Sequence, residues 1–241
     1  MLVSLNLRRQ RRLSMVELMV GITIGLIIVA AASMMMVNQI KEHRALTLET
    51  QIQQDLRAAT DLMLRDLRRA GFWAAPEGQV WAPGQAATGS NPYASTAGCS
   101  AQNSDKQVVY AFSKATYGPA TQQSVAQGSE VADNEYFGFR RSDKTIDFML
   151  GCANGKPNWQ PLTDENTLVV KDFSITPVVQ TLSLADFCSK PCADEQSCPR
   201  QEIRRYEIVL TVQAAFDNKV ERTLRVSSRQ RNDQILGACP T

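Results

Sequence analysis

Residues 13–37, LSMVELMVGITIGLIIVAAASMMMV, decide the fold, and the single formal charge among them is Glu17. A helix rises about 1.5 Å per residue, so a run of this length spans roughly 37 Å. The hydrocarbon core of a membrane requires about 20 apolar residues. The run therefore predicts a membrane-spanning helix. No second run of this kind occurs in the sequence, which predicts a single crossing.

The charges before this run predict its orientation. Residues 1–12 contain Arg8, Arg9, Arg11 and Arg12 and no acidic residue. Such a cluster stays on the cytoplasmic side, so the rest of the chain is expected in the periplasm. The chain has a net charge of +2, and without these four arginines the remainder is mildly acidic. No direct nucleic-acid binding is predicted from that balance.

The helix is expected to continue beyond the apolar run. Residues 38–70 contain no proline and no glycine, and Gly71 follows them as a stop signal. Apolar residues recur at steps of three and four, which predicts one buried stripe; they are Leu48, Ile52, Leu56, Ala59, Met63, Leu67 and Ala70. The sequence thus predicts a membrane or assembly half, 13–37, and an amphipathic half, 38–70. The stripe alone fits a coiled coil as well as packing on a sheet.

Residues 71–241 are expected to form a globular domain, with a long loop at 71–107 and a β-sheet region at 108–241. The loop is rich in Gly, Ala, Pro, Ser and Asn, and loops of this length are often functional. Alternating or β-branched segments predict the strands; they lie at 108–112, 136–139, 145–150, 167–175 and in a hairpin over 206–226. In 145–150, Ile146, Phe148 and Leu150 are expected to share one face. Residues 176–200 are expected to form a cysteine-bearing loop.

All the cysteines follow the membrane run; they are Cys99, Cys152, Cys188, Cys192, Cys198 and Cys239. An even number confined to the exported part predicts disulfides formed in an oxidising compartment. The sequence does not choose among the possible pairings. A zinc site is the alternative, but the spacings are not CxxC pairs and the single histidine, His43, is distant in sequence. No metal and no other cofactor is predicted.

The segment Leu13–Glu17, LSMVE, followed by a long apolar helix, resembles the signature of type IV prepilins and type II secretion pseudopilins. In that family a prepilin peptidase removes a short basic leader and methylates the new N-terminus. The resemblance implies cleavage between Arg12 and Leu13 and N-methylation of Leu13. It also implies an assembly salt bridge from Glu17 to the terminal amine of a neighbouring subunit. The family has glycine before the cut, where this sequence has Arg12, so removal and retention of the leader both stay open.

Two shorter segments, DLMLRDLRRAGFW (61–73) and SSRQRND (227–233), resemble PilW-type minor pilins. This resemblance implies an α+β, type IV pilin-like fold: a long N-terminal helix packed on an antiparallel β-sheet with disulfide-held loops. It implies a minor pilin that helps to start pilus assembly, sits at the filament tip and supports adhesion, twitching motility or DNA uptake. The implied partners are other minor pilins, the major pilin, prepilin peptidase, the inner-membrane assembly platform and membrane lipid. The implied location is the inner membrane, and the extracellular pilus after assembly.

Other functional classes remain as alternatives. Within the family, the alternative is a J-type pseudopilin of a type II secretion system. Outside it, an ordinary signal peptide cleaved after Ala32 would release a periplasmic or cell-surface binding protein. Arg11 and Arg12 also fit a twin-arginine export signal. The sequence has no GxSxG, HExxH or Gly-rich phosphate motif, so no catalytic residue is predicted and the protein is not expected to be an enzyme.

Overall fold

The computed structural model describes residues 14–74, 91–114, 131–194 and 197–240. The elements in chain order are α1 (Met15–Arg69), η1 (Pro92–Ala94), β1 (Gln107–Ala111), η2 (Asp133–Glu135), β2 (Tyr136–Ser142), β3 (Thr145–Ala153), β4 (Lys156–Pro161), β5 (Leu168–Ser183), η3 (Ala185–Phe187), β6 (Arg200–Ala214), β7 (Glu221–Arg229) and β8 (Gln234–Leu236). The chain divides into two compact units, Met1–Leu48 and Glu49–Thr241, and α1 contributes to both.

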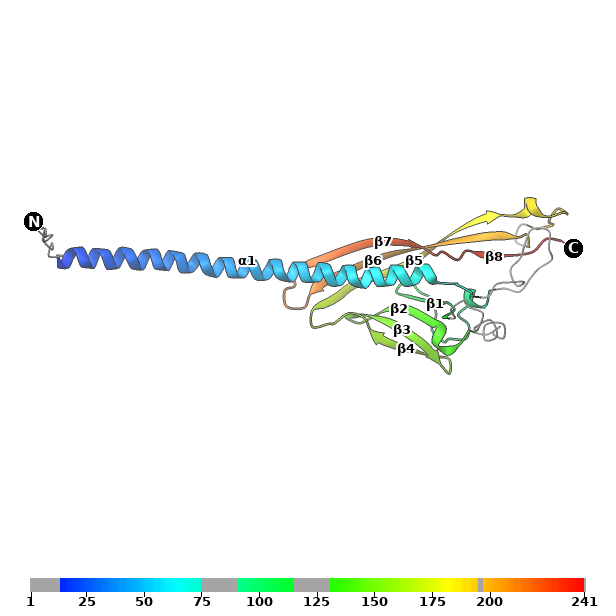
Figure 1. Ribbon diagram of the computed structural model, residues 1–241, viewed down its shortest axis with the longest axis horizontal. Helices are drawn as coiled ribbons and strands as arrows, with labels where there is room; N and C mark the ends of the chain where they lie inside the picture. Colours follow the sequence, from blue (N-terminus) through cyan, green and yellow to red (C-terminus); the bar gives the residue numbers. More distant parts are fainter. Residues whose placement is uncertain (1–13, 75–90, 115–130, 195–196, 241) are drawn as a thin grey trace, which may run out of the picture. The chain divides into compact units, whose positions relative to one another are not determined.

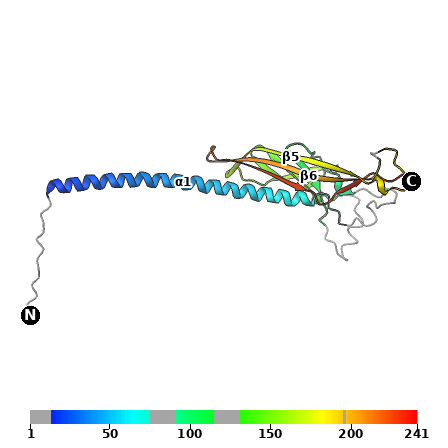
Figure 2. The same cartoon turned by 90° about the horizontal axis from the view of Figure 1, so that it is seen from above.

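The second unit contains two antiparallel sheets (Figure 1). The first has the strand order β1-β2-β3-β4, and the second has the order β5-β6-β7. β5 pairs with β6 over its whole length, apart from one bulge, from Leu168 opposite Ala214 to Ser183 opposite Arg200. β8 pairs with the start of β6, on the edge that β7 occupies further along. Figure 2 shows β5 and β6 from above.

The C-terminal part of α1 packs on both sheets through its predicted apolar stripe. Ile52, Leu56, Met63 and Leu67 are all buried, which confirms the periodicity seen in the sequence. The helix is followed by Gly71, which has a φ of +71° and donates its N–H to the Ala111 carbonyl at 2.8 Å. Glycine adopts this left-handed conformation without a steric penalty, which explains why the helix stops here.

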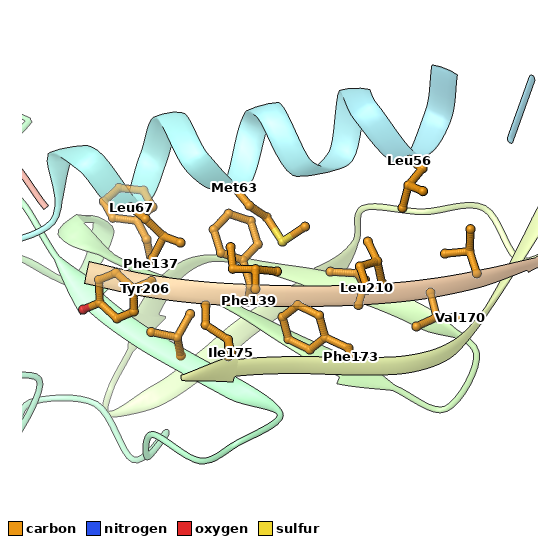
Figure 3. Close-up of a cluster of buried hydrophobic side chains, with 14 of the residues drawn as sticks. Leu56, Met63, Leu67, Phe137, Phe139, Val170, Phe173, Ile175, Tyr206 and Leu210 are labelled. Carbon is orange, nitrogen blue, oxygen red and sulfur yellow. The ribbon is translucent and has the colours of Figure 1, made fainter. Parts of the chain in front are cut away.

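The main hydrophobic core lies between α1 and the two sheets (Figure 3). Met63 and Leu67 extend from the helix toward Phe137 and Phe139 of β2. The second sheet adds side chains from β5 and β6; among them are Val170, Phe173, Ile175, Tyr206 and Leu210. Burying a large apolar side chain contributes about 1.5–3 kcal/mol. The shared core therefore holds the helix and the sheets of this unit together.

The predicted α+β, pilin-like fold, a long helix packed on antiparallel strands with disulfide-held loops, is confirmed. Some elements differ from the prediction. The strands form two sheets, and β4 and β8 were not predicted. β4 contains Pro157 and Pro161, which argue against a strand in sequence but are tolerated on a sheet edge. The expected loop over 176–200 begins as strand, because β5 continues to Ser183.

The predicted alternation in β3 is wrong at its end. Leu150 is 50% exposed, whereas Met149 is fully buried. The reason is that both faces of the first sheet are covered. The second face carries its own apolar cluster, which includes Met149 and Cys152. The register of β3 on β4 also shifts between Met149 and Cys152, so simple alternation does not continue through this strand.

Candidate assembly site

The first part of α1 presents an apolar surface that the rest of the described chain does not cover. Every side chain from residue 14 to residue 47 is exposed. By its length and composition, α1 could cross a membrane. Its polar groups are satisfied locally, since the Thr23 and Ser33 hydroxyls donate to the Val20 and Val29 carbonyls at 2.9 and 2.8 Å. This segment therefore suits an environment without water.

Glu17 lies in the first turn of this helix and is exposed. Ser14 caps the turn, because its hydroxyl accepts from the Val16 N–H at 3.4 Å and its carbonyl accepts from the Leu18 N–H at 3.1 Å. A carboxylate in the first turn also interacts favourably with the positive end of the helix dipole. The helix terminus thus stabilises the charge of Glu17.

The sequence analysis included Ser14 only as part of the prepilin signature and missed its capping role. Its spacing from Glu17, S-x-x-E, is that of a capping box and was the available signal. Among the residues that the structure describes, Glu17 forms no ion pair. Arg12 and Leu13 lie outside the described residues, so leader cleavage and N-methylation at this junction stay predictions.

The packed part of α1 is fastened to the sheets by polar contacts as well. Glu49 forms an ion pair with Arg222 at the start of β7. At the other end of the packed part, the Arg69 guanidinium lies 3.7 Å from the Asp66 carboxylate and 4.1 Å from the centre of the Phe112 ring. The Glu49–Arg222 ion pair and the contact of Arg69 with the Phe112 ring therefore join the helix to the rest of its unit.

Asp66 is a buried carboxylate, with 8% of its surface exposed. Burial raises the pKa of Asp66 above its usual 3.8, although Arg69 and Arg65 oppose this shift. Burial is also the main cause that raises the pKa of Tyr110 well above its usual value, and the charge of Asp66 adds to it. Ionised Asp66 is therefore a cost to the folded state rather than a contribution to its stability.

We expect Asp66→Asn to flatten the dependence of stability on pH. The folded state binds the Asp66 proton more tightly than the unfolded state, whose pKa is near 3.8. Stability from this group is therefore present at low pH and is lost as pH rises through the raised pKa. The free energy of unfolding of the variant, relative to the parent, should increase between pH 4 and pH 7. Denaturant titrations at several pH values measure it. Asp61→Asn, an exposed change on the same helix, is the control, and an equal effect there would contradict the assignment.

The structure resolves the pairing of the six cysteines. The disulfides are Cys99–Cys152, Cys188–Cys239 and Cys192–Cys198. The first joins the loop after η1 to β3 and lies within the second apolar cluster. The second joins the segment after η3 to the segment after β8, and the third closes a short loop before β6. The bridges therefore hold the loops around the sheets.

No group of three or more potential metal ligands occurs in the part of the chain that the structure describes. His43 is exposed on α1. The features described so far are thus an exposed apolar helix and a disulfide-held domain.

The comparisons with known proteins bear on the folded domain. Residues 45–230 match the family model described as "Prepilin peptidase-dependent protein B". Neither the curated proteins nor the solved structures contain a match. The family match starts in α1 after the apolar run, so it is independent of the segment Leu13–Glu17. It covers most of the chain, and the chain therefore belongs to the prepilin peptidase-dependent protein B family, which is related to type IV pili.

Proposed function

We propose that this chain is a minor pilin, a subunit that prepilin peptidase matures and that then enters a type IV pilus. The proposal rests on two independent observations that agree. Glu17 lies on an exposed apolar helix, in the position that the prepilin signature gives it, and the folded domain independently matches a prepilin peptidase-dependent family. The role is structural rather than catalytic.

The proposed mechanism is an exchange of surroundings for the apolar part of α1. In the inner membrane, lipid surrounds residues 13–37, and the folded domain lies in the periplasm. During assembly, the helices of neighbouring subunits replace the lipid. A carboxylate within a membrane is costly unless it is paired. The terminal amine of Leu13 in a neighbouring subunit would supply the cation for Glu17, which favours assembled over free subunits.

The more specific proposal is a PilW-type subunit that helps to start the filament and sits at its tip, with adhesion, twitching motility or DNA uptake as the function supported. The segments 61–73 and 227–233 support this through their resemblance to PilW-type pilins. Its partners would be other minor pilins, the major pilin and the inner-membrane assembly platform. A J-type pseudopilin would use the same helix chemistry, and the neighbouring genes would separate the two.

An ordinary secreted protein fits the structure less well. Cleavage after Ala32 would cut within α1, which runs without interruption from Met15 to Arg69. The continuous helix instead suits a mature chain that keeps its apolar segment. This observation favours the anchored subunit over the released binding protein.

The mature N-terminus tests the proposal. We expect intact and N-terminal peptide mass spectrometry, on protein extracted from membranes of cells with a prepilin peptidase, to find a chain beginning at N-methylated Leu13. The variant Arg12→Gly, which restores the residue typical of the family, is the matched control for processing. A chain beginning at Ser33 would contradict the pilin proposal. A chain that keeps Arg12, while Arg12→Gly is processed, would mean an anchored subunit that does not mature.

A further inference from the structure

The last part of β5, Pro177–Ser183, protrudes past the end of α1 together with its partner strand (Figure 1). Every side chain in this segment is exposed. Val179 is 46% exposed and Leu182 is 52% exposed. β5 is the edge strand of the second sheet. The segment is therefore a sheet edge that the hydrophobic core of the domain does not require.

The hydrogen-bond pattern shows which backbone groups face outward from this edge. The Ile175 N–H donates to the Asp105 carbonyl at 2.8 Å, so it points away from β6. On the opposite strand, the Arg204 carbonyl accepts from the Gln230 N–H at 2.9 Å and thus points away from β5. Arg204 is opposite Val179 in the register. The backbone groups of successive residues in a strand point alternately to its two edges. Ile175 and Val179 are an even number of residues apart, so both observations assign the same set of residues to the outer edge.

Every second residue after Ile175 therefore turns its backbone to the outer edge. These residues are Pro177, Val179, Thr181 and Ser183. Pro177 offers a carbonyl only, and each of the others offers both an N–H and a carbonyl. No described residue outside β5 is hydrogen-bonded to these outward groups. The edge thus presents a row of alternating donors and acceptors.

The edges at β4, at β7 and along the first part of β5 are protected by known means. β4 contains Lys156, Pro157 and Pro161, and β7 contains four charged residues in nine, among them Arg225. The first part of β5 is covered, because the Val170 and Ile175 N–H groups donate to carbonyls of the first sheet's loops. Natural proteins protect sheet edges with charges, prolines or covering segments. Beyond Pro177, the described part of β5 has none of these.

We propose that Pro177–Ser183 is a docking edge for an extended, uncharged segment of another polypeptide chain, which adds a strand to the second sheet. The unpaired backbone groups select a strand, since only an extended backbone matches their spacing. The charges select an uncharged occupant. Residues 176–183 carry no charge, and the nearby Arg205 is paired with Glu207 at 2.9 Å. Arg200 and Arg204 of β6, which lie opposite Ser183 and Val179, are already paired with Glu202 at 3.9 and 3.2 Å. A charged side chain on the added strand would therefore have to compete with existing ion pairs.

The side chains define the occupant further. Val178 and Leu182 lie on one face of the ribbon and Val179 on the other, because side chains alternate along a strand. The occupant should therefore carry apolar or β-branched residues on both faces. Cross-strand pairs of this kind stabilise added strands.

A second copy of this chain is a less suitable occupant. An antiparallel pairing centred on Gln180 would place Val178 opposite Leu182 of the copy. However, a two-fold axis at this edge would point the Glu49 ends of the two domains in opposite directions. Chains anchored in one membrane could not meet in this way, and this step rests on the proposed function. The docking edge itself does not depend on that function.

The test uses the full chain in detergent and a labelled synthetic peptide, TVTVTVTS, an uncharged strand of β-branched residues that is not a segment of this chain. We expect saturable binding, measured by fluorescence anisotropy, and slower hydrogen exchange at 177–183 when the peptide is bound. Thr181→Pro removes an outward N–H and should weaken binding by about tenfold or more, the effect of losing one strand bond at the centre of the edge. Thr181→Val keeps the N–H and should bind like the parent. Pro177 also turns its backbone to the outer edge, so β5 already contains a proline at a position of this kind. Thr181→Pro is therefore expected to be compatible with the strand.

Several outcomes would overturn the proposal. Equal peptide binding by Thr181→Pro and Thr181→Val would exclude the backbone edge as the site. Slow exchange at Val179, Thr181 and Ser183 before the peptide is added would mean that the chain covers its own edge. A dimer without peptide that Thr181→Pro disrupts would replace the proposed occupant with a second copy. If Thr181→Pro does not fold, Ser183→Pro removes an outward N–H at the end of the strand and takes its place.

Discussion

Replacing Glu17 by alanine is expected to leave the protein in the membrane but to exclude it from the assembled filament. The remaining apolar run is long enough to insert, and removing a carboxylate makes insertion easier. In the assembly, the substitution leaves the neighbouring terminal amine buried without its partner. Losing one member of a buried charge pair costs about 2–5 kcal/mol. Incorporation should therefore fall by more than about tenfold.

The measurement is the amount of this subunit in sheared, purified pili relative to the amount in membranes. Glu49→Ala is the matched control, because Glu49 is a carboxylate on the same helix that pairs within its own domain, with Arg222. Glu17→Asp, which keeps the charge, should retain part of the incorporation. Normal incorporation of Glu17→Ala would show that the amine–carboxylate pair does not drive assembly.

Removing the Cys99–Cys152 disulfide by a double change to serine should destabilise the domain about twice as much as removing the Cys192–Cys198 disulfide. This bridge closes a loop with a sequence separation of 53 residues, and both cysteines lie within the buried second cluster. Loop-closure entropy for this length corresponds to about 4 kcal/mol. At about 2–4 °C per kcal/mol for a domain of this size, the Tm should fall by about 8–16 °C.

The matched control is the double change of Cys192 and Cys198 to serine. That bridge has a sequence separation of only 6 residues, and the same entropy estimate is about 2 kcal/mol. The Tm should therefore fall by about 4–8 °C, roughly half as far. Thermal unfolding of both variants without reductant measures the difference. If the Tm fell further for the Cys192 and Cys198 variant than for the Cys99 and Cys152 variant, the greater stabilisation assigned to Cys99–Cys152 would be wrong.

The helix and part of the sheet were predictable because their signals are local. The stripe from Ile52 to Leu67 follows the period of a helix, and Gly71 supplies the backbone freedom that ends it. The hairpin of β6 and β7 follows from alternation around a polar turn. In each case, neighbouring residues alone determine the pattern, so tertiary contacts add stability but do not change the element.

Other features depend on residues that are distant in sequence. β4 contains two prolines and forms a strand only because it pairs with the edge of β3. Met149 is buried and Leu150 is exposed because a second apolar cluster covers the other face of the first sheet. β5 extends to Ser183 because β6 pairs with it throughout. No local pattern contains this information.

By itself, the sequence determined a single apolar helix with one carboxylate in its first turn, its amphipathic continuation, and six cysteines placed beyond the apolar run. Composition and short-range periodicity are sufficient for these features, because they reflect transfer from water and helix geometry. Only the tertiary structure decided which cysteines pair, how the strands divide into two sheets, and that the end of β5 keeps an open edge. These depend on which distant segments the folded chain brings together, because local alternation identifies a strand but not a partner strand that is distant in sequence.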